Sequence, residues 1–169
     1  MNTLRWERRD QHYELKQQHE TLVRLQYDAI KDCVFSLGNQ QYAIHRAGFW
    51  NPVYIILQQH KTIATLRHSF WGSGGNIQFS DSAVYQVEYK YKNTLTLCIL
   101  DADKELLRYY VIKENNKNQG FLQLGIHMED AERLLQLATL AMVVFLSIFN
   151  EFNSNGGDDV IIDLIHLAS

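Results

Sequence analysis

The sequence predicts a mainly β protein, in which about twelve antiparallel strands form a closed barrel around a central hydrophobic C-terminal helix. Three observations predict this fold class. Short runs rich in Tyr, Phe, Val, Ile, Thr and Leu recur at intervals of roughly ten residues. The run from Ala83 to Tyr91 alternates between apolar and polar side chains. The stretch from Leu134 to Phe149 is apolar almost throughout and is too long for a strand.

The twelve predicted strands follow one another with only short polar connectors between them. They are Leu4 to Arg8, His12 to Gln17, Thr21 to Tyr27, Cys33 to Leu37, Gln41 to Ala47, Val53 to Gln58, Thr62 to Ser69, Asn76 to Ser80, Ala83 to Tyr91, Thr94 to Leu100, Glu105 to Lys113 and Gly120 to His127. Such connectors favour antiparallel hairpins, so neighbours in sequence are expected to be neighbours in the sheet.

Two breaks in the strand pattern have local explanations. Pro52 fits the first residue of a strand, where its missing N–H does no damage. Residues 72–75, Gly-Ser-Gly-Gly, are predicted to form a flexible loop. No helix signal follows this loop, so the pattern does not indicate a phosphate-binding loop.

The apolar stretch predicts a helix of about six turns over residues 129–152. Glu129, Asp130 and Glu132 lie where a helix N-terminus favours negative charge, and the segment Asn153 to Gly157 supplies a stop. A helix that is apolar on nearly every side must be surrounded by protein or by lipid. Twelve strands enclose more space than their own side chains can fill, so a central helix is the expected filling.

A membrane anchor formed by residues 134–149 is the alternative. These residues would rise about 1.5 Å each and cover roughly 24 Å, short of the roughly 30 Å of a bilayer core. Neither flank carries the Lys and Arg cluster that orients a span. We therefore expect the middle of the helix, Ala141, Met142 and Val144, to be enclosed by strands.

The predicted barrel domain covers residues 1–152, and residues 153–169 form a C-terminal extension. Its apolar residues fall on one helical face, which predicts a short amphipathic helix: Val160, Ile161, Leu164, Ile165 and Ala168. We expect this helix to pack over the barrel mouth; the alternative is docking to a second subunit or to a membrane surface.

Composition and charge narrow the classes of function. The formal net charge of −3 argues against a nucleic-acid partner. The polar N-terminus lacks the apolar run of a secretory signal. Cys33 and Cys98 lie in separate apolar runs and are expected to be buried free thiols. These features indicate a cytoplasmic protein.

The sequence contains no recognisable catalytic, metal-binding or cofactor-binding constellation. The seven histidines lack the spacing that places two metal ligands on one helical face, and no Gly-x-Ser-x-Gly nucleophile motif is present. The acidic segment Asp101 to Glu105 lacks the glycine and glutamate of a calcium loop and reads as a hairpin turn. We therefore expect a non-enzyme with no cofactor.

Only a weak ligand site can be named. Lys90 and Lys92 share a polar strand face, and Arg67 projects from a neighbouring hairpin, which suggests an anion-binding patch. A solvated face of mixed charge, which includes Glu88, is the more favoured interpretation.

Two segments carry a resemblance to a known superfamily. They are YAIHRAGFWNPVYIILQQHKTIATLRHSFWGSGGNIQFSDSAVYQVEYKYKNTLTLCILDADKELLRYYVI and the closing helix AERLLQLATLAMVVFLSIF. Their order of strands, hairpins and final helix resembles the tubby C-terminal-domain superfamily, which includes phospholipid scramblases and plant LURP-one-related proteins. The resemblance implies a non-enzymatic binding or scaffold module, cytoplasmic or peripheral at a membrane, for phospholipid headgroups or a protein partner.

The chain departs from that superfamily in several features. It shows no counterpart of a basic headgroup site, a cysteine-rich palmitoylation cluster or a proline-rich N-terminal tail. Two other functions therefore stay open, the membrane-anchored protein described above and a lipocalin-like carrier of a small apolar ligand. A helix inside the barrel would occupy the carrier's cavity.

Overall fold

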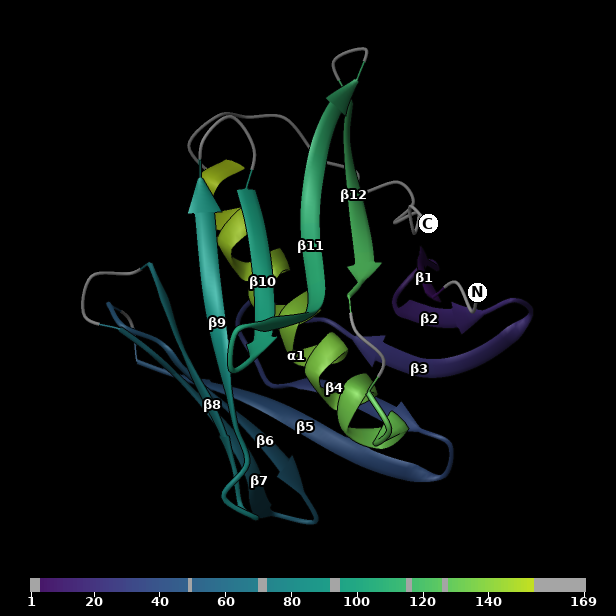
Figure 1. Cartoon of the computed structure of the whole chain (residues 1–169). Coiled ribbons are helices and arrows are strands. Elements are labelled where there is room, and N and C mark those ends of the chain that lie inside the picture. The colour runs from purple at the N-terminus through teal and green to yellow at the C-terminus, as the bar shows by residue number, and fades with distance from the viewer. Residues whose placement is uncertain are drawn as a thin grey trace.

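The computed structural model describes residues 4–48, 50–69, 73–91, 95–114, 117–125 and 128–153. These residues form one twelve-stranded antiparallel sheet, in which each strand pairs with the next along the chain, and the C-terminal helix α1 (Ala131–Asn153) (Figure 1). The strands are β1 (Leu4–Arg8), β2 (Tyr13–Gln17), β3 (Glu20–Gln26), β4 (Cys33–Leu37), β5 (Gln40–Ala47), β6 (Val53–Gln58), β7 (Lys61–His68), β8 (Gly74–Phe79), β9 (Val84–Tyr91), β10 (Leu95–Asp101), β11 (Lys104–Glu114) and β12 (Lys117–Leu124). The predicted meander is confirmed.

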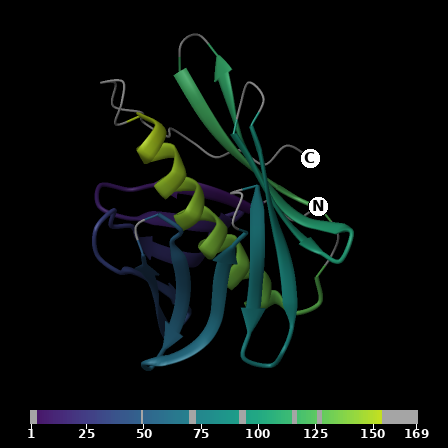
Figure 2. The ribbon, with the colours of Figure 1, turned by 90° about the vertical axis from the view of Figure 1, so that its left-hand side faces the viewer.

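The sheet curls around α1 into a nearly closed barrel. Figure 2 shows the helix running between the strands of the first half of the chain and those of the second half. β1 and β12 come close to one another, but no backbone ladder joins them in the part of the chain that the structure describes. The predicted barrel around a central helix is therefore the observed architecture.

Because each strand runs antiparallel to the next, successive connections alternate between the two ends of the barrel. Short turns at 18–19, 38–39, 59–60, 80–83 and 102–103 lie at one end, which we call the turn end. Connections 9–12, 27–32, 48–52 and 69–73 lie at the other, which we call the loop end. α1 begins at the turn end, where Arg133 pairs with Asp81, and approaches the loop end, where Ser147 lies 3.5 Å from the Tyr27 hydroxyl.

Packing on all sides accounts for the apolar composition of the helix. Ten consecutive residues, Leu137 to Leu146, are buried, and Ala141 and Met142 are 2% and 0% exposed. The expected enclosure of the mid-helix is confirmed. The Thr139 hydroxyl donates to the Leu135 carbonyl at 2.7 Å, which satisfies a buried polar group inside the barrel.

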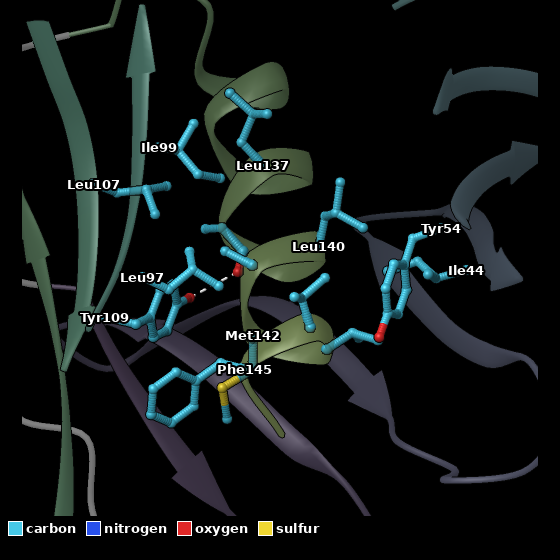
Figure 3. Packing of buried hydrophobic residues seen from close by; sticks show 14 of the residues in the cluster. Ile44, Tyr54, Leu97, Ile99, Leu107, Tyr109, Leu137, Leu140, Met142 and Phe145 are labelled. Carbon is cyan, nitrogen blue, oxygen red and sulfur yellow. Dashed lines mark hydrogen bonds between the residues drawn. The ribbon is translucent and has the colours of Figure 1, made fainter. Parts of the chain in front are cut away.

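Side chains from opposite walls meet the helix in the core. Figure 3 shows Leu97, Ile99 and Leu107 on one side of α1 and Ile44 and Tyr54 on the other. One hydrogen-bonded chain crosses the space between β1, β11 and α1. The Trp6 indole N–H donates to the Tyr109 hydroxyl at 2.8 Å, and that hydroxyl donates to the Ala138 carbonyl at 2.7 Å. These two hydrogen bonds hold α1 beside the gap between β1 and β12, where the barrel is not closed.

The helix also satisfies the length and composition of a membrane span. Ala131–Ile148 is long and apolar enough to cross a bilayer, but 67% of this segment is buried in the barrel. Strand side chains therefore surround most of this helix, whereas lipid would surround it if it were a membrane anchor.

Several predicted boundaries differ from the structure, and the largest strand differences are at β8 and β12. β8 begins at Gly74, so the last two glycines of the expected flexible loop belong to a strand. A Cβ at Gly74 would lie 2.2 Å from the Val87 carbonyl oxygen, and one at Gly75 would lie 2.4 Å from that of Arg67, so close strand contact requires glycine. β12 begins at Lys117, before the predicted Gly120, because the β11–β12 hairpin is tight and pairs Glu114 with Lys117, and it ends at Leu124. The predicted amphipathic helix lies outside the described residues.

Candidate functional site

The barrel interior leaves no space for a ligand between α1 and the wall formed by β7–β10. The gap there is lined only by apolar side chains and does not admit a water molecule. Its lining residues are Leu66, Ile77, Val87, Leu97, Ile99, Leu140, Ala141 and Val144. A ligand at this wall could therefore bind only on its outer face.

A group of charged residues covers the outer face of β1–β3, and we call it the charge cluster. It consists of Arg5, Glu7, Arg9, His12, Glu14, Lys16 and Arg24. Strand register creates it, because Glu7 lies directly opposite Glu14 in the β1–β2 ladder. Two carboxylates in this position repel one another unless cations lie between them.

Lys16 is the central cation of the cluster. Its Nζ lies 3.1 Å from one Glu7 oxygen and 3.2 Å from one Glu14 oxygen, and its side chain is 17% exposed. Arg9 also contacts both carboxylates, at 2.8 Å for Glu7 and 3.5 Å for Glu14. The two acidic side chains are thus held together by shared cations.

The carboxylates of the cluster stay ionised at neutral pH. Burial raises the pKa of Glu14, but hydrogen bonds from His12 and Lys16 outweigh burial and hold the pKa below its ordinary value. Burial likewise raises the pKa of Glu7, and hydrogen bonds from Lys16 and Arg5 lower it by more. Each carboxylate therefore carries a negative charge within a ring of cations.

The charge cluster nevertheless has an excess of positive charge. Three arginines and one lysine oppose two carboxylates, a local net charge of +2 on a chain whose formal charge is −3. The Arg24 side chain is 68% exposed, and its Nε lies 3.5 Å from Glu14. Its guanidinium therefore remains accessible to an anion from solvent.

An open depression of about 470 Å³ adjoins the cluster on β2–β5. Glu14, Arg24, Ser36 and Gln41 form one row across these strands, since each is paired with the next in the ladders. The depression is lined by His12, Glu14, Arg24, Gln26, Val34, Phe35, Ser36 and Gln41. Its amide, hydroxyl and guanidinium groups are the donors that recognise phosphate.

The structure does not bring the sequence-derived anion candidates together. Arg67 is exposed on β7 and is paired through Asn76 to Gln86, four residues before Lys90 on β9. Four strand residues and two strand spacings separate Arg67 from Lys90 by roughly 16 Å. Lys90 lies 3.4 Å from Glu88, and Lys92 lies outside the described residues.

The charge cluster was missed in the sequence, although a signal for it was present. Arg5 and Glu7 alternate on one side of the first predicted strand, and Glu14 and Lys16 alternate on one side of the second. A tight connection between these strands places the two pairs on one face. Reading the register across the hairpin would therefore have located the cluster.

A second polar group lies inside the loop end. The His68 Nδ1 donates to the Pro52 carbonyl at 2.8 Å, because a carbonyl can only accept. Its Nε2 then accepts from the Tyr89 hydroxyl at 2.6 Å. Burial lowers the pKa of His68, and the nearby Arg46 charge lowers it further. The histidine therefore acts as a neutral link between β7, β9 and the 48–52 loop.

Cysteine and metal chemistry add no further site. Cys33 and Cys98 are buried and unbridged, as the sequence predicts. Among the described residues, no three His, Cys, Asp or Glu side chains are grouped as metal ligands would be.

Comparisons with protein-family models, with curated proteins and with solved structures gave no match to this chain.

Proposed function

We propose that this chain is a non-enzymatic, tubby-like binding module that recognises anionic phospholipid headgroups at its charge cluster. In this proposal the protein is cytoplasmic and binds peripherally at a membrane. The observation that carries the proposal is the local excess of cations beside an open polar depression on β2–β5.

The filled interior supports a surface site over an internal one. A lipocalin-like carrier needs a cavity for its apolar ligand, whereas the space between α1 and β7–β10 does not admit water. An apolar ligand could enter this region only by displacing the helix. Recognition of a charged headgroup at the outer face requires no such rearrangement.

The chemistry of the cluster supports a phosphate-bearing ligand. Arg24 presents a guanidinium that can donate two parallel hydrogen bonds to phosphate oxygens. Ser36 and Gln41 lie in the same cross-strand row and supply neutral donors.

Vesicle binding tests the proposal with a matched pair of charge reversals. The full chain is mixed with phosphatidylcholine vesicles that contain or lack phosphatidylserine, and bound protein is measured by sedimentation. Arg24→Glu reverses a charge within the charge cluster. Arg67→Glu reverses the charge of another exposed arginine, on β7, outside the charge cluster.

We expect the wild type to bind the anionic vesicles and Arg24→Glu to bind more weakly. A cation near such a surface contributes about 1 kcal/mol, so its reversal costs about 2 kcal/mol, or roughly 30-fold in affinity. Arg67→Glu should bind like the wild type. Equal binding to neutral and anionic vesicles, or an equal loss in both variants, would contradict a headgroup site at the charge cluster.

A further inference from the structure

A group of apolar side chains lies on the outer face of β4–β6, beside the polar depression. Side chains on these strands alternate between the two faces of the sheet, and Phe35, Ile44 and Ile56 are buried inside the barrel. Their neighbours along each strand therefore point outward. The apolar ones among these neighbours form what we call the apolar strip: Val34, Ala43, Ile55 and Leu57.

Strand pairing makes the apolar strip continuous. Val34 on β4 is paired with Ala43 on β5, and Ala43 is paired with Leu57 on β6. Ile55 lies two residues before Leu57 and shares its face. Because neighbouring strands lie about 4.8 Å apart, the row from Val34 to Leu57 extends over about 10 Å.

The row that forms most of the apolar strip carries no ionisable side chain. It continues from Val34 to Gln26 on β3 and from Leu57 to Thr62 on β7. A row on the outer face of β9–β11 is different, because it places charged side chains on both sides of a cysteine: Glu88, Cys98 and Arg108. The wall next to the depression is thus free of the charges found on other parts of the outer face.

The carboxylate at the loop-end side of the apolar strip already has a partner. The Asp32 carboxylate lies 2.6 Å from the His45 ring nitrogen on β5. An apolar group that covers the strip therefore does not have to bury an unpaired carboxylate there.

The apolar strip adjoins the polar row of the depression. On β4, Val34 lies two residues from Ser36, and on β5, Ala43 lies two residues from Gln41. Two strand residues correspond to roughly 7 Å. Val34, which is 40% exposed, lines the depression together with Arg24. One ligand can therefore contact the guanidinium and the apolar strip at the same time.

We infer that the ligand of this site is a phosphate-bearing amphiphile, whose phosphate binds Arg24 and whose acyl chain lies along the apolar strip. This inference rests on the proposed function and adds the chemical class of the whole ligand, because a headgroup alone would use only the polar row. An acyl chain on the strip removes apolar surface from water on both partners.

The size and charge of the surface favour a single lipid molecule over a protein partner. Two rows about 7 Å apart and about 10 Å long present roughly 70 Å². A stable protein interface covers about 800 Å² per partner, which is more than ten times this area. A cation at one side and an uncharged apolar surface at the other match the polarity of one amphiphile.

A series of alkyl phosphates tests the inference. Butyl, hexyl and octyl phosphate are titrated into the full chain by isothermal titration calorimetry, at concentrations that do not form micelles. A methylene that contacts the strip on one side gains about half the transfer free energy of a buried methylene, which is about twofold in affinity. We therefore expect octyl phosphate to bind about 16-fold more tightly than butyl phosphate.

Threonine substitutions in the apolar strip keep a high β propensity and remove apolar contact. In Val34→Thr and in Leu57→Thr, the octyl-to-butyl affinity ratio should fall to about fourfold, because each change removes contact with roughly half of the chain. Val84→Thr is the matched control, since Val84 is 49% exposed on β9, outside the apolar strip, and should keep the wild-type ratio. Arg24→Glu should weaken the binding of all three phosphates.

Several results would overturn the inference, and they differ in what they say about the proposed function. Equal affinities for the three phosphates, all weakened by Arg24→Glu, would leave a headgroup site without the apolar strip. Binding of anionic vesicles that depends on Arg24, without binding of any alkyl phosphate, would have the same meaning. A protein that binds neither the alkyl phosphates nor anionic vesicles would remove both proposals.

Two further outcomes would assign the chain or the strip differently. A chain-length effect that is unchanged in Val34→Thr and Leu57→Thr would locate the alkyl chain elsewhere and overturn the inference. A wild-type dimer that Val34→Thr converts to a monomer in sedimentation velocity would assign the apolar strip to a second copy of this chain.

Discussion

Replacing Ala141 with aspartate places a carboxylate at the centre of the enclosed helix. Ala141 is 2% exposed, and the gap beside it is lined by aliphatic side chains and does not admit water. The new side chain would find neither a hydrogen-bond donor nor solvent. Protonating an ordinary Asp carboxyl with a pKa of about 3.9 at pH 7 costs about 4 kcal/mol, and an unpaired ionised form is at least as unfavourable.

A loss of about 4 kcal/mol is a large part of the 5–15 kcal/mol that stabilises a typical domain. With a urea dependence of about 2 kcal/mol per molar, the unfolding midpoint should fall by about 2 M. The assay is urea unfolding followed by far-ultraviolet circular dichroism. Ala131→Asp is the matched control, because Ala131 is exposed at the first residue of α1, where negative charge is tolerated. An Ala141→Asp protein that unfolds at the wild-type urea concentration would refute the enclosed helix.

Two further predictions concern buried polar contacts. Tyr109→Phe should lower the free energy of unfolding by about 1–3 kcal/mol, because the Trp6 N–H loses its acceptor and the Ala138 carbonyl loses its donor. Adding Trp6→Phe in that background should cost less than Trp6→Phe alone, and additive losses in urea unfolding would argue against the shared contact. Because burial lowers the folded-state pKa of His68, the unfolded chain binds more protons below about pH 6.5, and stability should fall as pH drops through that value. His68→Gln should remove that part of the pH dependence of the unfolding midpoint, and the exposed-site control His19→Gln should keep it; an unchanged profile in His68→Gln would contradict the neutral link.

The strands could be predicted because apolar alternation is a local property of the chain. In the run from Ala83 to Tyr91, Tyr85 and Val87 were expected on the buried side, and they are 7% and 3% exposed. Helix α1 was predictable for a related reason, since no strand continues over so long an apolar stretch. Its predicted start at residue 129 lies two residues before the observed start at Ala131, and the Asp130 carboxylate accepts from the Arg133 N–H at 2.9 Å.

Strand ends were harder to predict when contacts with distant residues set them. Gly74 and Gly75 read as loop residues in sequence, yet the nearby carbonyl oxygens of Val87 and Arg67 require strand residues without a side chain. Those oxygens belong to β9 and β7, whose approach becomes known only when the sheet is assembled. The local sequence pattern therefore predicted a loop at two glycines that belong to a strand.

The candidate site depended on register, which explains why the cations grouped from the sequence differ from those that the structure brings together. Arg67 and Lys90 were grouped because both were expected on outward faces, but pairing through Asn76 and Gln86 places them far apart along β9. The Glu7–Glu14 pairing instead gathers cations on β1–β3. A shift of one residue in either hairpin would have moved these side chains to the opposite face.

The enclosed helix is the central claim, and detergent-free fractionation followed by amide hydrogen exchange tests it most directly. The account predicts that the full chain is recovered without detergent, has a β-rich circular dichroism spectrum, and protects the amides of Leu137 to Leu146 from exchange as strongly as the most protected strands. Recovery only with detergent in the membrane fraction, or rapid exchange of these amides in detergent-free protein, would contradict a barrel that encloses α1.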